Sequence, residues 1–141
     1  MIVLDTNIIS EPNKRLPAQQ VVDWLNSQQA PALFTTTINV AELRFGIERL
    51  PDGKKKTALW AALDFTLGRL CANRILSFDL PAAEELARIN TQCEATGKKI
   101  GLADAQIAAV AKVNGFAVAT RDATPFELAG VTVIDPWKWP Q

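Results

Sequence analysis

The chain contains no histidine and no tyrosine among its 141 residues. The lack of histidine excludes imidazole general bases, serine–histidine or cysteine–histidine nucleophile pairs, and zinc sites with histidine ligands. Acid–base or metal chemistry in this chain must therefore rely on carboxylates, with Lys, Arg, Ser and Thr in support. Cysteine is scarce, because only Cys71 and Cys93 are present, and they form no CxxC motif. We expect both to be reduced thiols of a cytoplasmic protein.

The chain also lacks an excess of charge of either sign, because 15 basic residues balance 15 acidic ones. Overall electrostatics gives no indication of a nucleic-acid binder, so only the fold could gather a local basic patch. No apolar run is long enough to cross a bilayer, and Asp5 interrupts the first run, so we expect neither a membrane span nor a signal peptide. The apolar content of 48% and the length indicate one globular domain, residues 1–141.

Short apolar runs alternate with segments of helical periodicity. This pattern predicts strands at 1–5, 32–37, 74–78, 116–120 and 131–135, and helices at 17–28, 37–50, 54–70, 80–97 and 101–115. Strands separated by helices indicate an α/β fold with a parallel sheet covered on both faces. In such sheets ligands bind at the carboxyl ends of the strands, where the strand order reverses.

Two of the predicted strands run directly into an aspartate. The run MIVL continues into DTN, which begins with Asp5, and the run FAVA continues into TRD, which ends with Asp122. If these strands are neighbours, Asp5 and Asp122 converge at one end of the sheet. Taken alone, each aspartate could instead be a turn residue or a helix cap.

Two further carboxylates lie on predicted helices. Glu42 borders the apolar stripe of the helix at 37–50, and Asp104 is the only acidic residue of the very apolar segment 101–115. Glu42 could also be a solvated residue, and Asp104 could serve the helix dipole. Gly46 lies one turn after Glu42, at a cost of about 1 kcal/mol of helix propensity relative to Ala. It predicts a close approach between this helix and other backbone.

Converging carboxylates need a counter-charge or protons, because two like charges about 4 Å apart repel by roughly 4 kcal/mol at an effective dielectric constant of about 20. A site with oxygen ligands alone favours a hard cation, Mg²⁺ or Mn²⁺, over zinc. Such ions usually handle phosphate groups, and they can generate hydroxide for the hydrolysis of a phosphodiester.

In these motifs the chain resembles the PIN-domain ribonucleases, and among them the VapC-like toxins of bacterial toxin–antitoxin pairs, in the FitB-like branch. The similar stretches follow the family's order and spacing: MIVLDTNIISEP, INVAELRFGI, GLADAQIAA, VATRDATPF and, near the end, VTVIDPW. The resemblance implies a three-layer α/β/α sandwich on a five-stranded, mainly parallel sheet with strand order 3-2-1-4-5. It extends over nearly the whole chain, which implies a single PIN domain.

The resemblance also implies roles for individual residues. The catalytic residues, which hold Mg²⁺ or Mn²⁺, would be Asp5, Glu42, Asp104 and Asp122. Thr6 and Thr120 would orient the metal ligands or the water, and Asn7 would brace Asp5. Candidates for holding RNA phosphates are Arg44, Arg121, Lys98 and Lys99.

The activity implied by the resemblance is metal-dependent hydrolysis of RNA phosphodiester bonds by an endoribonuclease. The implied partners are an RNA substrate and a cognate antitoxin protein, with DNA bound only indirectly, through the antitoxin. The implied assembly is a homodimer in the cytoplasm, with no membrane contact.

Other interpretations of the acidic residues stay open. The chain could be a PIN fold kept as a catalytically idle binding module, or a nuclease directed at DNA. A Mg²⁺-binding receiver-like signalling domain needs an acidic pair after the first strand, and a phosphatase of the haloacid-dehalogenase type needs Asp-x-Asp there. This chain has a single Asp at that point, followed by Thr6 and Asn7.

Overall fold

The computed structural model describes residues 1–140, in which five parallel strands form one sheet in the order β3-β2-β1-β4-β5. The strands are β1 (Ile2–Leu4), β2 (Leu33–Thr36), β3 (Ile75–Leu76), β4 (Ala117–Ala119) and β5 (Val133–Ile134). The predicted α/β architecture and strand order are confirmed. Because β1 and β4 are neighbours, the strand order reverses between the two strands that run into Asp5 and Asp122.

Seven α-helices connect the strands within these residues. They are α1 (Thr6–Ser10), α2 (Gln19–Ser27), α3 (Thr37–Glu48), α4 (Lys54–Cys71), α5 (Leu80–Ala95), α6 (Leu102–Asn114) and α7 (Ala123–Leu128). The five predicted helices are confirmed, with small shifts at their ends. The short helices α1 and α7 were not predicted, because five and six residues are too few to show a helical period.

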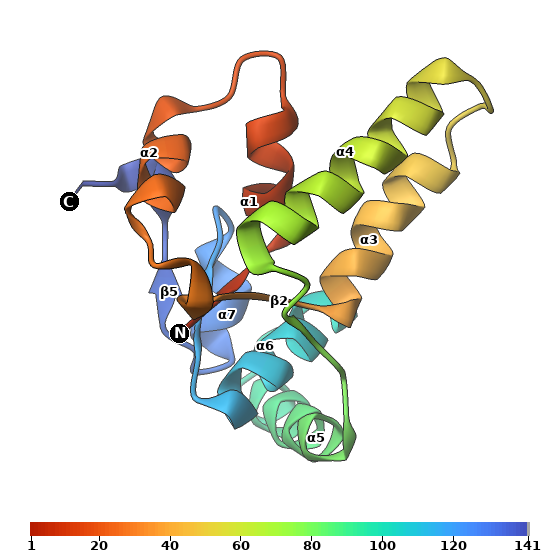
Figure 1. The fold of residues 1–141 in the computed structure, drawn as a ribbon. Coiled ribbons are helices and arrows are strands. Elements are labelled where there is room, and N and C mark those ends of the chain that lie inside the picture. Colours follow the sequence, from red (N-terminus) through yellow and green to blue (C-terminus); the bar gives the residue numbers. More distant parts are fainter. Residues whose placement is uncertain (141) are drawn as a thin grey trace.

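The helices cover both faces of the sheet and form two apolar cores. Figure 1 shows α5 and α6 below the sheet, with α1, α2 and α4 above it. Val3 and Val118 belong to the core between the sheet and helices α5 and α6. The next residues, Leu4 and Ala119, belong to the core on the other face of the sheet. Successive side chains of a strand point to opposite faces, so a strand buried on both faces is apolar throughout.

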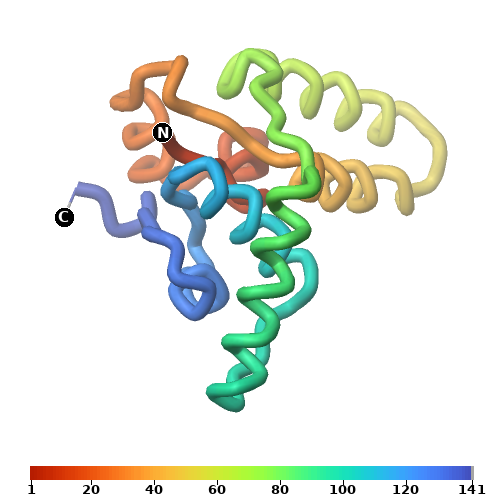
Figure 2. Tube along the Cα trace, turned by 90° about the horizontal axis from the view of Figure 1, so that it is seen from below, coloured from red at the N-terminus to blue at the C-terminus, as the bar shows by residue number. Residues whose placement is uncertain are grey.

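Two helical hairpins, α3–α4 and α5–α6, extend beyond the sheet (Figure 2). The predicted end of α6 is confirmed, since Gly115 has a φ of 71° in the left-handed region that favours glycine. The prediction for Gly46 is wrong, because a Cβ atom added there would meet no atom within 4 Å. Among the described residues, no helix combines the length and the apolar character needed to cross a membrane.

Candidate active site

Asp5 lies at the carboxyl end of β1, beside the end of β4. Its backbone N–H donates to the carbonyl oxygen of Ala119 at 3.0 Å, which extends the parallel pairing by one residue. Its carboxylate accepts a hydrogen bond from the Thr120 hydroxyl at 2.7 Å and another from the Thr6 N–H at 2.8 Å. Asp5 therefore caps α1 and also faces β4, so the cap and the site residue are the same side chain.

Asn39 gives Asp5 a further support that the sequence analysis did not identify. Its amide nitrogen Nδ2 donates to Asp5 Oδ1 at 2.9 Å and to the Thr6 hydroxyl at 3.1 Å. Its amide oxygen accepts from the hydroxyl of Thr36, the N-cap of α3, at 2.6 Å. A signal was present in the sequence, because a polar side chain stands among apolar residues in the first turn of the helix that carries Glu42.

The Asn7 side chain forms its hydrogen bonds with Thr120 and Arg121 and not with Asp5. Its Nδ2 donates to the Thr120 hydroxyl at 3.4 Å, and its Oδ1 accepts from the Arg121 backbone N–H at 3.3 Å. Thr120 in turn is fully buried and donates to Asp5. Asn7 thus supports Asp5 indirectly, through Thr120, whereas Asn39 donates to the Asp5 carboxylate itself.

The structure brings the four carboxylates together around one cavity of about 400 Å³, which we call the acidic cavity. It is lined by Asp5, Thr6, Asn7, Ser10, Lys14, Glu42, Asp104 and Asp122. The carboxylates come from β1, α3, α6 and the start of α7, so only the folded chain can assemble them. Of the seven predicted site residues, Thr120 alone does not line the cavity, because it lies behind Asp5.

Burial and mutual repulsion disfavour the ionised form of three of these carboxylates. Burial is the main cause that raises the pKa of Asp5, and the charge of Asp122 adds to it against the hydrogen bonds that Asp5 accepts. Burial likewise raises the pKa values of Glu42 and Asp104, and both carboxylates are also repelled by Asp5. The acidic cavity is therefore an environment that a bound cation would stabilise.

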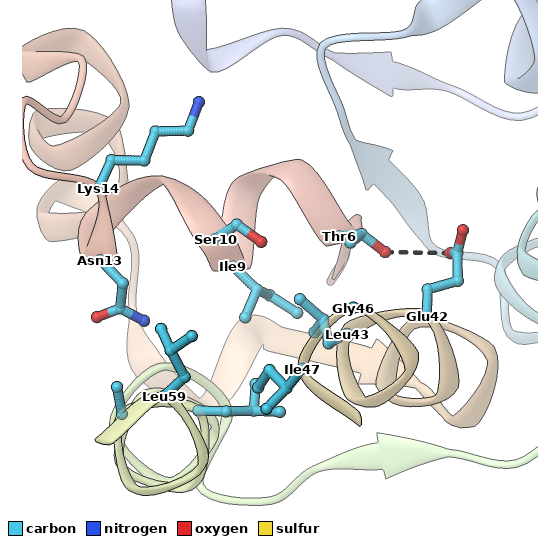
Figure 3. A pocket seen from close by; sticks show the side chains of 12 residues that line it. Thr6, Ile9, Ser10, Asn13, Lys14, Glu42, Leu43, Gly46, Ile47 and Leu59 are labelled. Carbon is cyan, nitrogen blue, oxygen red and sulfur yellow. Dashed lines mark hydrogen bonds between the residues drawn. The ribbon is translucent and has the colours of Figure 1, made fainter. Parts of the chain in front are cut away.

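The chemistry of these side chains suits a hard cation. The carboxylates offer oxygen atoms alone, which favours Mg²⁺ or Mn²⁺. Within residues 1–140, however, no three acidic or thiol side chains stand close enough to form a ready-made metal-binding group. Carboxylates without a counter-ion repel one another. Two of them are held by protein donors: Glu42 accepts a hydrogen bond from the Thr6 hydroxyl at 3.1 Å (Figure 3), and Asp5 accepts those described above.

None of the four predicted phosphate-binding cations lines the acidic cavity. Arg44 faces α4, with its guanidinium carbon 4.9 Å from the ring centre of Trp60. Lys98 and Lys99 line a different cavity, at the end of α5. Arg121 directly precedes Asp122, and its guanidinium carbon lies 4.9 Å from the ring centre of Trp137.

A second depression adjoins the acidic cavity, and we call it the apolar groove. It runs between α1, α3 and α4, and its apolar lining consists of Ile9, Leu43, Gly46, Ile47, Leu59, Ala62 and Leu63 (Figure 3). Thr6, Ser10, Lys14 and Glu42 line both the groove and the acidic cavity. Gly46 leaves open space in the groove, so no backbone of residues 1–140 approaches α3 closely at this position.

Comparison with known proteins agrees with this geometry. The chain is 46% identical over 138 residues to the VapC ribonuclease Y4jK of Sinorhizobium fredii, which covers 98% of this chain and 99% of the relative. It is 45% identical over 137 residues to the toxin FitB of Neisseria gonorrhoeae, covering 97% and 99%. The solved structure of FitAB bound to an IR36 DNA fragment superposes with a TM-score of 0.92 at 42% identity, covering 100% of this chain and 99% of that one.

The model of the family described as the PIN domain matches residues 2–131. This match includes β1, α3, α6 and the start of α7, which supply the carboxylates of the acidic cavity. The chain therefore belongs to the PIN-domain family.

Proposed function

We propose that this chain is a metal-dependent endoribonuclease and the toxin of a toxin–antitoxin pair. The observation that carries the proposal is the convergence of Asp5, Glu42, Asp104 and Asp122 on one cavity at the point where the strand order reverses. The names of the two relatives, a VapC ribonuclease and a toxin, support this function.

In this proposal the four carboxylates hold Mg²⁺ or Mn²⁺. When bound, such an ion supplies an activated water and stabilises the charge that develops on the phosphodiester. The chain's own residues orient the ligands, since Thr6 holds Glu42, and Thr120 and Asn39 hold Asp5. Outer residues of this kind fix the direction of a ligand's lone pairs and so tune metal affinity.

We further propose that an antitoxin segment occupies the apolar groove. The groove is open, apolar and continuous with the acidic cavity through Glu42, so a basic side chain of the bound segment can reach the carboxylates. The solved FitAB structure is bound to DNA, which supports DNA binding by the complex with the antitoxin. The homodimer, the cytoplasmic location and the single PIN domain over 1–141 are parts of the same proposal. Gln141, the end of that domain, lies outside the described residues.

The test is cleavage by the purified chain, free of antitoxin. Total RNA and single-stranded DNA are incubated side by side with Mg²⁺ or Mn²⁺, with and without EDTA, beside the Asp5→Asn variant. We expect discrete RNA fragments that require the metal ion and disappear in the variant. Equal inactivity of both proteins with every metal, while metal binding persists, would favour the idle binding module. Cleavage of DNA alone would redirect the proposal to a deoxyribonuclease.

A further inference from the structure

Lys14 is the one cation that lines the acidic cavity within residues 1–140. Thr6, Ser10 and Lys14 follow one another at intervals of four residues, and Figure 3 shows Thr6 and Ser10 on α1 and Lys14 beyond its end. The cavity therefore has an acidic end at Glu42 and a basic end at Lys14, with two hydroxyl side chains between them.

A buried carboxylate holds Lys14 in place. The Lys14 ammonium lies 3.0 Å from Glu11 Oε1, and Glu11 is only 3% exposed. The other carboxylate oxygen of Glu11 accepts a hydrogen bond from the backbone N–H of Ala18 at 3.1 Å. A buried carboxylate that accepts from a backbone donor has a fixed position. The Glu11 carboxylate is therefore a fixed partner for Lys14, although the Lys14 side chain itself is exposed.

Arg121 lies on the same side of the molecule as this ion pair. Burial alone would raise the pKa of Glu11, but the hydrogen bonds from Lys14 and Ala18 and the charges of Lys14 and Arg121 lower it overall. The Arg121 side chain also lies against the ring of Trp137, which restricts its motion. We call Lys14 and Arg121 the basic rim.

The basic rim carries more charge than Glu11 neutralises, because Lys14 pairs with Glu11 and Arg121 adds a second positive charge near the same carboxylate. RNA is repelled by the carboxylates of the acidic cavity, so its phosphates need cations beside the cleavage position. Lys and Arg contacts to phosphates set the position of a strand without reading its sequence. Such contacts suit cations that are already held in place by Glu11 and Trp137.

We infer that the basic rim is a phosphate-binding subsite for the RNA strand next to the bond that is cut. This inference rests on the proposed ribonuclease function and adds to it the residues that hold the substrate. Lys14 and Arg121 each bind a backbone phosphate, and the Ser10 hydroxyl lies between Lys14 and the carboxylates. Glu11 is a positioning residue, since it acts on RNA only through Lys14.

The test measures RNA binding separately from cleavage. Binding of a fluorescently labelled single-stranded RNA is followed by anisotropy in EDTA over a series of KCl concentrations. The proteins are the wild type, Lys14→Gln, Arg121→Gln, the double variant and Lys14→Arg. The matched control is Lys55→Gln, on the exposed side of α4. Thermal unfolding of each protein shows that it is folded.

We expect each single glutamine variant to bind RNA about threefold to tenfold more weakly, whatever the RNA sequence. Each lost phosphate contact should also reduce the slope of log affinity against log salt by about 0.7. Lys14→Arg should keep both properties, and the Lys55→Gln control should match the wild type. If Lys14 had only a structural role, Lys14→Gln would lower the unfolding temperature of the protein and leave the salt dependence of RNA binding unchanged.

The possible outcomes separate this inference from the proposed function. RNA binding with the wild-type salt slope in the double variant overturns the inference, and so does the absence of RNA binding by the wild type. If the wild type cleaves RNA but the Lys14 and Arg121 variants bind RNA as the wild type does, the ribonuclease function is supported and the phosphate-binding subsite is wrong. If binding depends on the basic rim but no RNA is cut, the subsite stands and the ribonuclease fails.

Discussion

At the scale of single residues, the site depends on one buried amide. Asn39 has no alternative orientation that satisfies its neighbours, because the Thr36 hydroxyl needs an acceptor and the Asp5 carboxylate needs a donor. The same amide nitrogen reaches Thr6, whose hydroxyl holds Glu42. A single side chain thus sets the relative positions of two predicted metal ligands from β1 and α3.

The Asn39→Asp substitution tests this dependence with almost no change of shape. It places a second carboxylate against Asp5, where a donor was, so the two side chains repel each other. We expect Mn²⁺ affinity, measured by calorimetry, to fall by about 10-fold to 100-fold, with a comparable loss of RNA cleavage. The control is Asn90→Asp, an exposed position on α5. Wild-type Mn²⁺ affinity in Asn39→Asp would show that Asp5 does not need the amide.

The Asp5→Asn substitution should separate activity from stability. Burial disfavours the Asp5 carboxylate, whereas an amide oxygen can still accept the hydrogen bonds from Thr6 and Asn39. We expect a folded protein without metal-dependent cleavage and with a free energy of unfolding in EDTA higher by about 1 kcal/mol. Urea unfolding checks this, with Asp64→Asn at an exposed site as the control. A loss of stability in Asp5→Asn would mean that the carboxylate stabilises the fold as the N-cap of α1 by more than its burial costs.

At the scale of elements, the apolar pattern predicted the long helices and the strands but missed the two short helices. The five long helices and all five strands follow from apolar spacing. Helices α1 and α7 have five and six residues, too few to show a period, and they begin directly after Asp5 and Asp122. The four acidic residues could be found because each stands out against an apolar element. Asn39 was missed because its partners come from three different elements.

The Gly46 correction leads to a prediction for α3. A glycine in a helix is compatible with a close backbone contact and also with an open groove. The structure shows the open groove, because a Cβ atom at Gly46 would meet no atom within 4 Å. Because a Cβ atom fits at Gly46, Gly46→Ala should raise the free energy of unfolding by about 1 kcal/mol through helix propensity. It should also weaken antitoxin binding, since Gly46 lines the apolar groove.

Gly68→Ala on α4 is the matched control for this change. Its Cβ atom would also meet nothing within 4 Å, and Gly68 does not line the apolar groove. We expect equal stabilisation in chemical unfolding but unchanged antitoxin binding in a pull-down titration. Equal antitoxin affinity for the two variants would remove the groove from the proposed interface.

At the scale of the whole molecule, a charged network joins the helices on the α5–α6 side of the sheet. Glu85 on α5 lies 2.7 Å from Arg88 and 3.3 Å from the ammonium of Lys112 on α6. Lys112 also donates to the carbonyl oxygen of Ala129 at the end of α7, at 3.0 Å. The network joins α6 to α5 on one side and to the end of α7 on the other.

This network predicts how stability depends on pH. The hydrogen bond from Arg88 lowers the pKa of Glu85 below its ordinary value of 4.5, and Lys112 adds to this effect against the burial of the carboxylate. A group with a lowered pKa in the folded state contributes stability above its unfolded pKa and loses that contribution as the pH falls through the folded value. Glu85→Gln should therefore lower the free energy of unfolding by about 1 kcal/mol at neutral pH, because both cations are partly solvated. The deficit should shrink below pH 4.5.

Urea unfolding from neutral pH down to about pH 3 measures the difference, with Glu84→Gln at an exposed neighbouring position as the control. A constant gap between wild type and Glu85→Gln over that range would show that Glu85 stabilises the helices by packing and not by its charge.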